Sequence, residues 1–307
     1  MRKKIVTIGG GSGHCELLRG LRDLDIDLTA VVSTMDNGGP NGVLRDEYGV
    51  VPPSDLRKCL SALIPNNDSQ ANRWWSYRFS SGTLDQYTVG NILLTALTKE
   101  YGSVHCALDR IRKLFHIQAH VLPVSEQFAD LVAVLEDGTK IVGETNIDIP
   151  QHNASLHIRS LSLSSPVEVT PQVREAIHAA DLIVLSFGDL YTSVIANLCV
   201  TGVSQAIYES KAQVVYVCNR STKKGETHNF TTNDFYRELN HYLAPAKVHT
   251  MIVDTGSIPV PSFAQAVAVA PIEDGQMMSI NLADEKKPEK VSGKKAAKII
   301  YSLCTSL

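Results

Sequence analysis

A glycine-rich loop, Gly9-Gly10-Gly11-Ser12-Gly13, offers the clearest chemistry in this sequence. It follows the apolar run Ile5–Ile8 and precedes leucines at helical spacing, so it joins a predicted strand to a predicted helix. Glycines let a backbone approach an anion, and the free N–H groups of a first helical turn bind phosphate oxygens. Ser12 adds a hydroxyl donor or a helix cap. We therefore predict that this loop binds a phosphate-bearing ligand; the alternative is a tight strand-to-helix turn without a ligand.

Two better-known phosphate motifs do not fit this loop. No Gly-Lys-Ser/Thr follows it, which excludes a Walker A motif. The third glycine position of a dinucleotide fingerprint holds Glu16. An NAD-type oxidoreductase is therefore disfavoured.

A second polar loop, Met35–Gly42, follows the predicted strand Leu28–Thr34. In open α/β sheets, ligands bind at the carboxyl ends of the strands, so this loop should lie beside the first. Asp36 could bind a ribose hydroxyl, ligate Mg²⁺ or act as a general base, and it is the candidate catalytic residue. Its alternative role is turn capping. Arg45 pairs with phosphate or lies on the surface as a solvated arginine.

The segment Pro52-Pro53-Ser54-Asp55-Leu56-Arg57 predicts a stiff entry into a helix, with Ser54 as its cap. That structural role competes with a ligand role for Asp55 and Arg57. Asp36 and Asp55 are the candidate ligands for a metal, with Mg²⁺ the cation considered.

A third loop of the same kind follows the predicted strand Leu182–Ser186. Like the glycine loop, it places a glycine and small hydroxyl residues at the start of a predicted helix, where they could bind an anion: Gly188, Thr192 and Ser193. Asn219 ends a later strand, where it could contact a base or a sugar. The adjacent Lys223 and Lys224 are assigned to a solvated basic loop rather than to a phosphate clamp.

Short apolar runs alternate with helical patterns along most of the chain, which predicts a doubly wound, mostly parallel, Rossmann-like sheet. The remaining predicted strands are Ala119–Val124, Leu131–Leu135, Val214–Cys218 and Val248–Val253. The predicted helices are Ser12–Leu24, Asp55–Ile64, Asn91–Tyr101, Pro171–Ala179, Thr192–Tyr208 and Thr232–Leu243.

One stretch interrupts this alternation. Asp137-Gly138 lies between two short runs and predicts a hairpin, so residues 121–163 are expected to form an antiparallel addition. Residues 284–307 are expected to form a charged linker and a last helix. We therefore predict one domain over residues 1–307.

The amino-acid composition limits the kinds of partner expected for this chain. The net charge of −3 argues against a broad basic surface for nucleic acid or an anionic membrane. The six cysteines include no CxxC pair, and no apolar stretch reaches the roughly 18 residues of a membrane span. We expect a cytoplasmic protein, and a homodimer built on exposed helices such as Thr192–Tyr208.

Taken together, these loops resemble the family that contains 2-phospho-L-lactate transferase (CofD) and the gluconeogenesis factors of the YvcK type. The glycine loop, Asp36-Asn37-Gly38-Gly39, Pro52–Arg57, Tyr191–Ile195 and Gly225-Glu226-Thr227 carry the resemblance in order. It extends from Lys4 to about Leu243. Gly90-Asn91-Ile92-Leu93-Leu94 resembles the YvcK-type branch in particular.

The resemblance implies binding of UDP-sugars and a role in carbon metabolism, cell-wall supply and cell shape. The transferase branch implies instead the Mg²⁺-dependent transfer of a phospholactyl group from a dinucleotide to a deazaflavin. Loop positions and resemblance together give these ligand-binding residues: Gly10, Gly11, Ser12, Gly13, Thr34, Asp36, Asn37, Gly38, Gly39, Arg45, Asp55, Arg57, Asn91, Gly188, Asp189, Tyr191, Thr192 and Asn219.

The chain departs from the family pattern at several of these positions. Asn37 stands where the family has a second carboxylate, which weakens a two-carboxylate Mg²⁺ site. Asp189 brings a negative charge into the third loop, where it would repel phosphate unless a metal or a lysine intervenes. Ser54 and Lys58 also differ from the pattern. A regulator without turnover is the first hypothesis, and a phospho-group transferase is the second.

Overall fold

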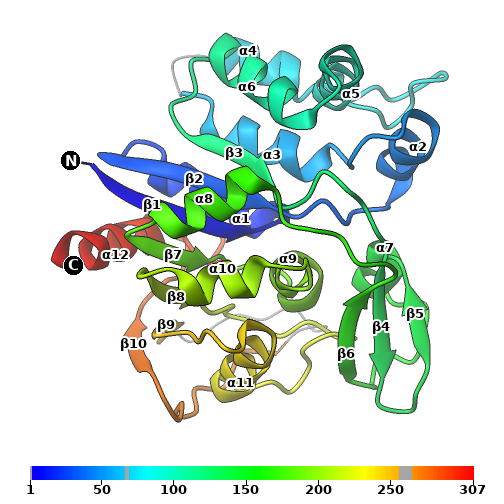
Figure 1. Ribbon diagram of the computed structural model, residues 1–307. Helices are drawn as coiled ribbons and strands as arrows, with labels where there is room; N and C mark the ends of the chain where they lie inside the picture. The colour runs from blue at the N-terminus through cyan, green and yellow to red at the C-terminus, as the bar shows by residue number, and fades with distance from the viewer. Residues whose placement is uncertain (1, 66–68, 256–264) are drawn as a thin grey trace.

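The computed structural model describes residues 2–65, 69–255 and 265–307. Its centre is a seven-stranded sheet in the order β10-β9-β8-β7-β1-β2-β3, with every neighbouring pair parallel (Figure 1). The strands are β1 (Lys3–Gly9), β2 (Ile26–Val32), β3 (His120–Pro123), β7 (Leu182–Leu185), β8 (Gln213–Val217), β9 (Thr250–Asp254) and β10 (Gln276–Ile280). The predicted doubly wound fold is confirmed.

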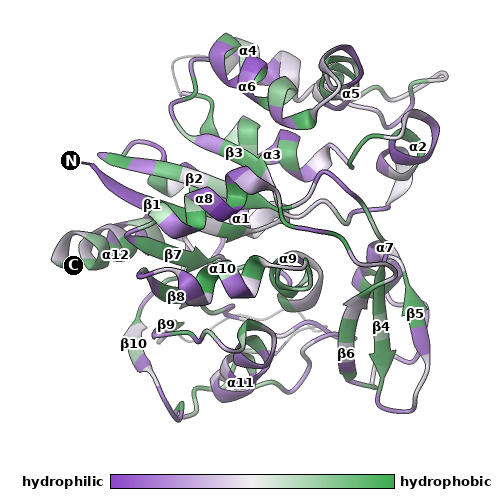
Figure 2. Ribbon diagram, in the orientation of Figure 1, coloured by the Kyte–Doolittle hydropathy of each residue, from purple (hydrophilic) through white to green (hydrophobic). Residues whose placement is uncertain are grey.

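Both faces of this sheet are covered, as its continuous apolar strands predict. Successive residues of one strand enter different cores: Ile5 packs with the helices on one face, and Val6 packs with those on the other. Green segments predominate in the central parts of strands such as β2 and β7 in Figure 2, whereas green and purple alternate along the helices. Burial on two sides fixes the register of the strands and so fixes where their carboxyl ends lie.

Helices from both halves of the chain form the outer layers. On the face that buries Ile5 are α1 (Gly11–Leu21), α3 (Ser54–Leu63), α6 (Val104–Leu114) and α12 (Gly293–Ser306). On the face that buries Val6 are α8 (Pro171–Ala179), α9 (Ala196–Leu198), α10 (Val203–Glu209) and α11 (Thr232–Leu243). Beyond β3 lie α2 (Gly39–Tyr48), α4 (Ser69–Trp75) and α5 (Val89–Tyr101) (Figure 1). In the described part of the chain, we find no helix with the length and apolarity to cross a membrane.

A small antiparallel sheet, β5-β4-β6, stands apart from the main one. It consists of β4 (Leu131–Leu135), β5 (Lys140–Val142) and β6 (Ile158–Leu163), with α7 (Glu144–Asp148) between the last two strands. The hairpin predicted at Asp137-Gly138 is present. The predicted addition began too early, because residues 121–123 pair with β2 in the parallel sheet.

The predicted helix Thr192–Tyr208 is not continuous. Leu190–Ile195 form a π-helical segment (η1), α9 follows, and the chain breaks at Gly202, whose φ is +91°. Every residue from Leu190 to Leu198 is buried. The first half of the predicted helix is therefore buried, whereas Gln205 and Tyr208 of its second half are exposed, so a dimer built on that half stays a prediction.

Candidate functional site

The chain reverses its direction of travel across the sheet between β1 and β7. Strands β1, β2 and β3 run to one edge, and β7 to β10 then run to the other. Such a switch point leaves a crevice at the carboxyl ends of the two central strands. A cavity of about 680 Å³ lies there, between the loops that follow β1, β7 and β8. Its lining includes six of the predicted residues: Gly11, Ser12, Gly13, Gly188, Asp189 and Asn219.

The glycines of the first loop bring the loops after β1 and β7 into contact. A Cβ atom on Gly13 would lie 2.0 Å from the carbonyl oxygen of Phe187, and one on Gly9 would lie 2.0 Å from Oγ of Ser186. Gly11 has a φ of +63°, which favours glycine. The wall of the cavity therefore depends on close backbone packing that no larger residue permits.

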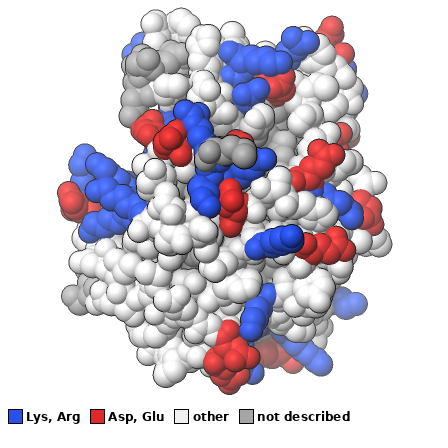
Figure 3. Space-filling model, turned by 60° about the vertical axis from the view of Figure 1, so that its left-hand side comes forward, with Lys and Arg blue, Asp and Glu red and all other residues white. Residues whose placement is uncertain are grey.

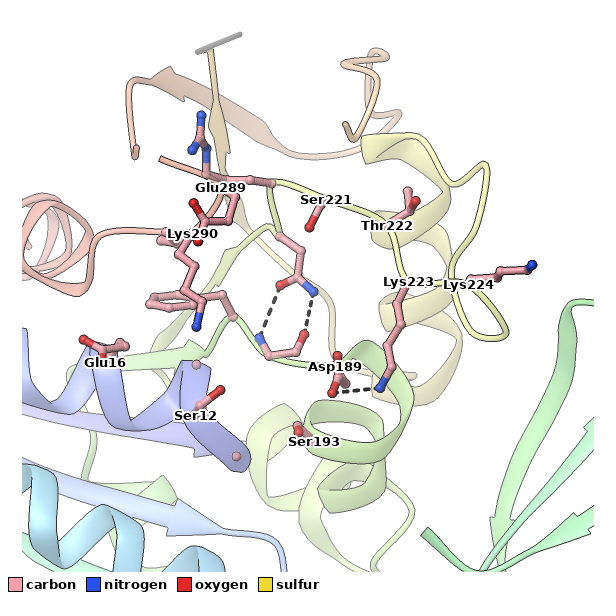
Figure 4. Close-up of a pocket in the computed structure, with 17 residues that line it drawn as sticks. Ser12, Glu16, Asp189, Ser193, Ser221, Thr222, Lys223, Lys224, Glu289 and Lys290 are labelled. Carbon is pink, nitrogen blue, oxygen red and sulfur yellow. Dashed lines mark hydrogen bonds and ion pairs between the residues drawn. The ribbon is translucent and has the colours of Figure 1, made fainter. Parts of the chain in front are cut away.

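The third loop is held by a reciprocal pair of hydrogen bonds (Figure 4). Nδ2 of Asn219 donates to the Gly188 carbonyl at 2.6 Å, and the Gly188 N–H donates to Oδ1 of Asn219 at 3.2 Å. Behind this loop, Nδ2 of Asn197 donates to the carbonyls of Gly9 and Ser193. The π-helical segment is thus tied to the glycine loop, and Asn219 acts first as a positioning residue.

The first turn of α3 contacts the glycine loop through Asp55. Oδ2 of Asp55 accepts the Gly11 N–H at 2.8 Å, and Oδ1 accepts from the Lys58 ammonium at 2.8 Å. Asp36 accepts the Gly38 N–H at 2.8 Å and the Asn41 side-chain amide at 2.7 Å. Burial, as the largest cause, raises the pKa of the Asp36 carboxyl, so it retains a proton to higher pH than an exposed aspartate.

Asn91 is linked to Asp36 through Asn41, because Nδ2 of Asn91 donates to Oδ1 of Asn41 at 3.1 Å. The structure thus brings Asn91, Asp36 and Gly38 together around Asn41. Gly39, the first residue of α2, has a φ of +43° and opens that helix.

Asn37 and Arg45 hold the antiparallel sheet in place. Oδ1 of Asn37 accepts the Thr145 N–H at 3.2 Å, and the Arg45 guanidinium contacts Asp130 at 2.7 Å. Arg45 also lies over the Phe128 ring, 5.5 Å from its centroid. These contacts account for both side chains without a ligand.

Three more predicted residues are buried and make protein contacts. The Thr34 hydroxyl donates to the Ser125 carbonyl, and the Tyr191 hydroxyl donates to Glu238 at 3.0 Å. Arg57 lies within the core, where Trp75 donates to its carbonyl. Thr192 is buried as well, with its hydroxyl free of hydrogen-bond partners among the described residues. Thr34, Arg57, Tyr191 and Thr192 do not line the cavity at the switch point.

Lys223 lies among three carboxylates at one end of the cavity. Its Nζ is 3.0 Å from Asp189, 2.8 Å from Glu226, and in contact with Asp148 of α7. Figure 4 shows the Lys223–Asp189 pair beside the cavity. The prediction of a solvated loop is wrong for Lys223 and fits the exposed Lys224. The ammonium offsets the charge of Asp189, which meets the concern that this carboxylate would repel phosphate.

Two glutamates in this region resist ionisation. Burial, as the main cause, raises the pKa of Glu226 and that of Glu144 to about 8. Neighbouring aspartates raise both values further, since like charges disfavour the ionised form. The region therefore carries fewer negative charges at neutral pH than its composition suggests.

Ser193, which belongs to the predicted third loop, also lines the cavity. The rest of the cavity wall was not predicted from the sequence: Glu16, Phe187, Arg220, Ser221, Thr222, Lys224, Glu289, Lys290 and Val291. The polar run after Asn219 is visible in the sequence, but nothing there connects residues 289–291 to the glycine loop. They arrive because the segment after β10 returns across the carboxyl edge before α12 packs against α1.

Comparison with known proteins agrees with this architecture. The family model described as 2-phospho-L-lactate transferase CofD matches residues 5–293. A Thermotoga maritima protein named as a gluconeogenesis factor is 43% identical over 253 residues, covering 82% of this chain and 79% of its own length. The gluconeogenesis factor of Bacillus subtilis is 33% identical over 259 residues, covering 84% and 80%.

A solved structure extends the likeness to the whole fold. The crystal structure of a Bacillus halodurans protein superposes with a TM-score of 0.90 at 30% identity, covering 98% of this chain and 100% of that one. The predicted family resemblance is confirmed. With its glycine loop at the switch point of a doubly wound sheet, this chain belongs to the CofD family and is similar to the gluconeogenesis factors within it.

Proposed function

We propose that this chain is a cytoplasmic nucleotide-sugar-binding protein, of the UDP-sugar type, that regulates carbon metabolism and cell-wall supply, and through them cell shape, without turnover. The cavity at the switch point is the observation that carries the proposal. It combines the first turn of α1, two further strand-end loops and a volume of about 680 Å³, within the range of small-molecule sites. The gluconeogenesis-factor relatives support the metabolic role.

The diphosphate would lie at the N-terminus of α1. Ser12 and Gly13 line the cavity there, and the helix dipole favours negative charge at this end. Lys290 supplies a cationic group to the cavity, whereas the side chain of Lys224 extends away from it (Figure 4). The hydroxyl of Ser221 lies at the edge of the cavity formed by the loop after β8, where it would face the base or the sugar (Figure 4).

A small-molecule ligand also suits the charge distribution. The face drawn in Figure 3 carries basic and acidic side chains interspersed, without a continuous basic stripe. Proteins that bind nucleic acid through its backbone need such a stripe. We accordingly propose neither a nucleic acid nor a membrane as the partner.

Isothermal titration calorimetry tests the proposal directly. UDP-glucose and other UDP-sugars, UDP, GDP and NAD would each be titrated into the protein, with inorganic phosphate as the control for simple anion binding. We expect UDP-sugars to bind with dissociation constants of about 1–100 μM, that is about −8 to −5.5 kcal/mol, and GDP and NAD to bind at least about tenfold more weakly. An absence of heat and of any thermal shift with all the nucleotides would contradict the proposal.

A second candidate function is a Mg²⁺-dependent phospho-group transferase. The match of the transferase family model over residues 5–293 favours it, and the raised pKa of Asp36 would suit a group that accepts a proton from an acceptor hydroxyl. Metal dependence discriminates the two functions. If Mg²⁺ changes neither nucleotide binding nor the consumption of candidate dinucleotide donors, the transferase candidate fails.

A further inference from the structure

The two carboxylates expected to hold Mg²⁺ already have partners in the protein. Asp36 accepts from Gly38 and Asn41, one donor to each oxygen. Asp55 accepts from Gly11 and Lys58, again one donor to each oxygen. Mg²⁺ demands near-octahedral oxygen ligands, and the Lys58 ammonium that is ion-paired with Asp55 would repel a divalent cation placed beside that carboxylate. This set of residues therefore does not fit Mg²⁺.

Lys58 is the positively charged residue beside Asp36 and Asp55. Its Nζ lies 2.8 Å from Oδ1 of Asp55, and the side chains of Lys58 and Asp55 are 39% and 15% exposed. The same carboxylate holds the Gly11 N–H, at the start of the glycine loop. A carboxylate this sheltered, and facing Asp36, requires a compensating positive charge.

We infer that Lys58 supplies, from within the chain, the positive charge that a divalent cation would otherwise bring to Asp36 and Asp55. Lys58 is thus a positioning residue: it holds Asp55, and Asp55 holds the glycine loop. Ligand binding at the adjacent cavity should then be independent of divalent metal, a consequence that rests on the proposed function.

Mn²⁺ is the probe that tests this inference without any nucleotide. Free Mn²⁺ is counted by its electron paramagnetic resonance signal during titration of the wild type, Lys58→Met and the double variant Lys58→Met/Asp55→Asn. Removing the ammonium should unmask a Mn²⁺ site at least about tenfold tighter than any Asp55-dependent site of the wild type. The double variant should lose that site, which also separates it from binding at Asp148, Asp189 and Glu226.

Lys99→Met is the matched control, since within the described residues Lys99 donates to the Tyr48 carbonyl at the surface. It should bind Mn²⁺ as the wild type does. Circular dichroism and thermal melting would confirm that each variant is folded, with Lys58→Asn in reserve if the methionine variant aggregates. Two results would overturn the inference: an Asp55-dependent Mn²⁺ site of comparable affinity in the wild type, or no gain in either folded Lys58 variant. Neither result depends on whether UDP-sugars bind.

Discussion

Gly13→Ala tests whether the close packing of two loops builds the ligand cavity. The added methyl group would lie 2.0 Å from the Phe187 carbonyl oxygen and 2.8 Å from its carbon, both backbone atoms. Restoring an ordinary contact of 3.4 Å requires the loops after β1 and β7 to separate by about 1.4 Å. Overpacking of this kind costs about 1–3 kcal/mol of folding free energy.

The same separation displaces the first turn of α1 from the Gly188 loop. Because the proposed ligand contacts both, we expect its affinity to fall by at least about tenfold, that is 1.4 kcal/mol. Affinity would be measured by calorimetry with UDP-glucose, and stability by urea unfolding.

Gly20→Ala is the matched control in the same helix. Its methyl group would lie 2.3 Å from the Gly293 carbonyl oxygen, where α1 packs against α12, and neither Gly20 nor Gly293 lines the cavity. Both variants should lose stability, but only Gly13→Ala should lose affinity. Unchanged affinity in a destabilised Gly13→Ala protein would refute the reasoning, as would equal losses of affinity in the two variants.

Three further predictions concern the loops around the cavity. Asn219→Ala removes both hydrogen bonds to Gly188, and we expect about 1–3 kcal/mol lower stability by urea unfolding and several-fold weaker nucleotide binding; unaltered binding would show that the Gly188 loop needs no support. Lys223→Met leaves the carboxylates around Lys223 without their positive charge, so the unfolding free energy should drop by about 1–3 kcal/mol. This loss is smaller than for a fully buried pair, because the Lys223 side chain is 29% exposed. An unchanged unfolding free energy would contradict the charge argument. Folded Glu226 and Glu144 keep protons up to a pKa of about 8, whereas the unfolded chain releases them near 4.5, so their contribution to stability falls as pH rises between these values. Buried histidines such as His14, whose pKa lies at about 4, oppose this trend only below about pH 6.5. The melting temperature should therefore drop by roughly 2–5 °C from pH 6.5 to 8, and Glu226→Gln should make this dependence on pH weaker. A melting temperature that does not change with pH, or one that changes equally in the variant, would contradict the proposed role of the two glutamates.

Much of the parallel sheet followed from the sequence because each strand is buried on both faces. Runs such as Leu182–Leu185 have no polar face, and that feature separates parallel strands from amphipathic ones. Helices α8 and α11 begin and end at the predicted residues, with Thr170 and Thr231 as side-chain caps. Here local signals and tertiary packing agree.

Prediction failed where tertiary contacts override local propensity. Helix α2 begins with Gly39-Pro40-Asn41-Gly42, whose composition is typical of a loop, yet Pro40 fits a first helical turn. The π-helical segment at Leu190–Ile195 has no period that distinguishes it from an α-helix in the sequence. Strand β10 is half exposed and lies at the edge of the sheet, so its apolar signal is weak.

For the site, the sequence located the loops but not the direction of their side chains. Asn37 of the second loop and Arg45 of α2 both turn to the antiparallel sheet and bind Asp130. Lys58 lies one helical turn after Asp55, a spacing that allows an ion pair without requiring one. Such pairings depend on the packing of elements distant in sequence.

A crystal structure of the protein with a bound UDP-sugar tests the central claim most directly. The account predicts density for the diphosphate at the N–H groups of Ser12 and Gly13, with the ligand extending between the loops after β7 and β8. A UDP-sugar bound elsewhere on the molecule, with the cavity at the switch point filled only by solvent, would contradict it.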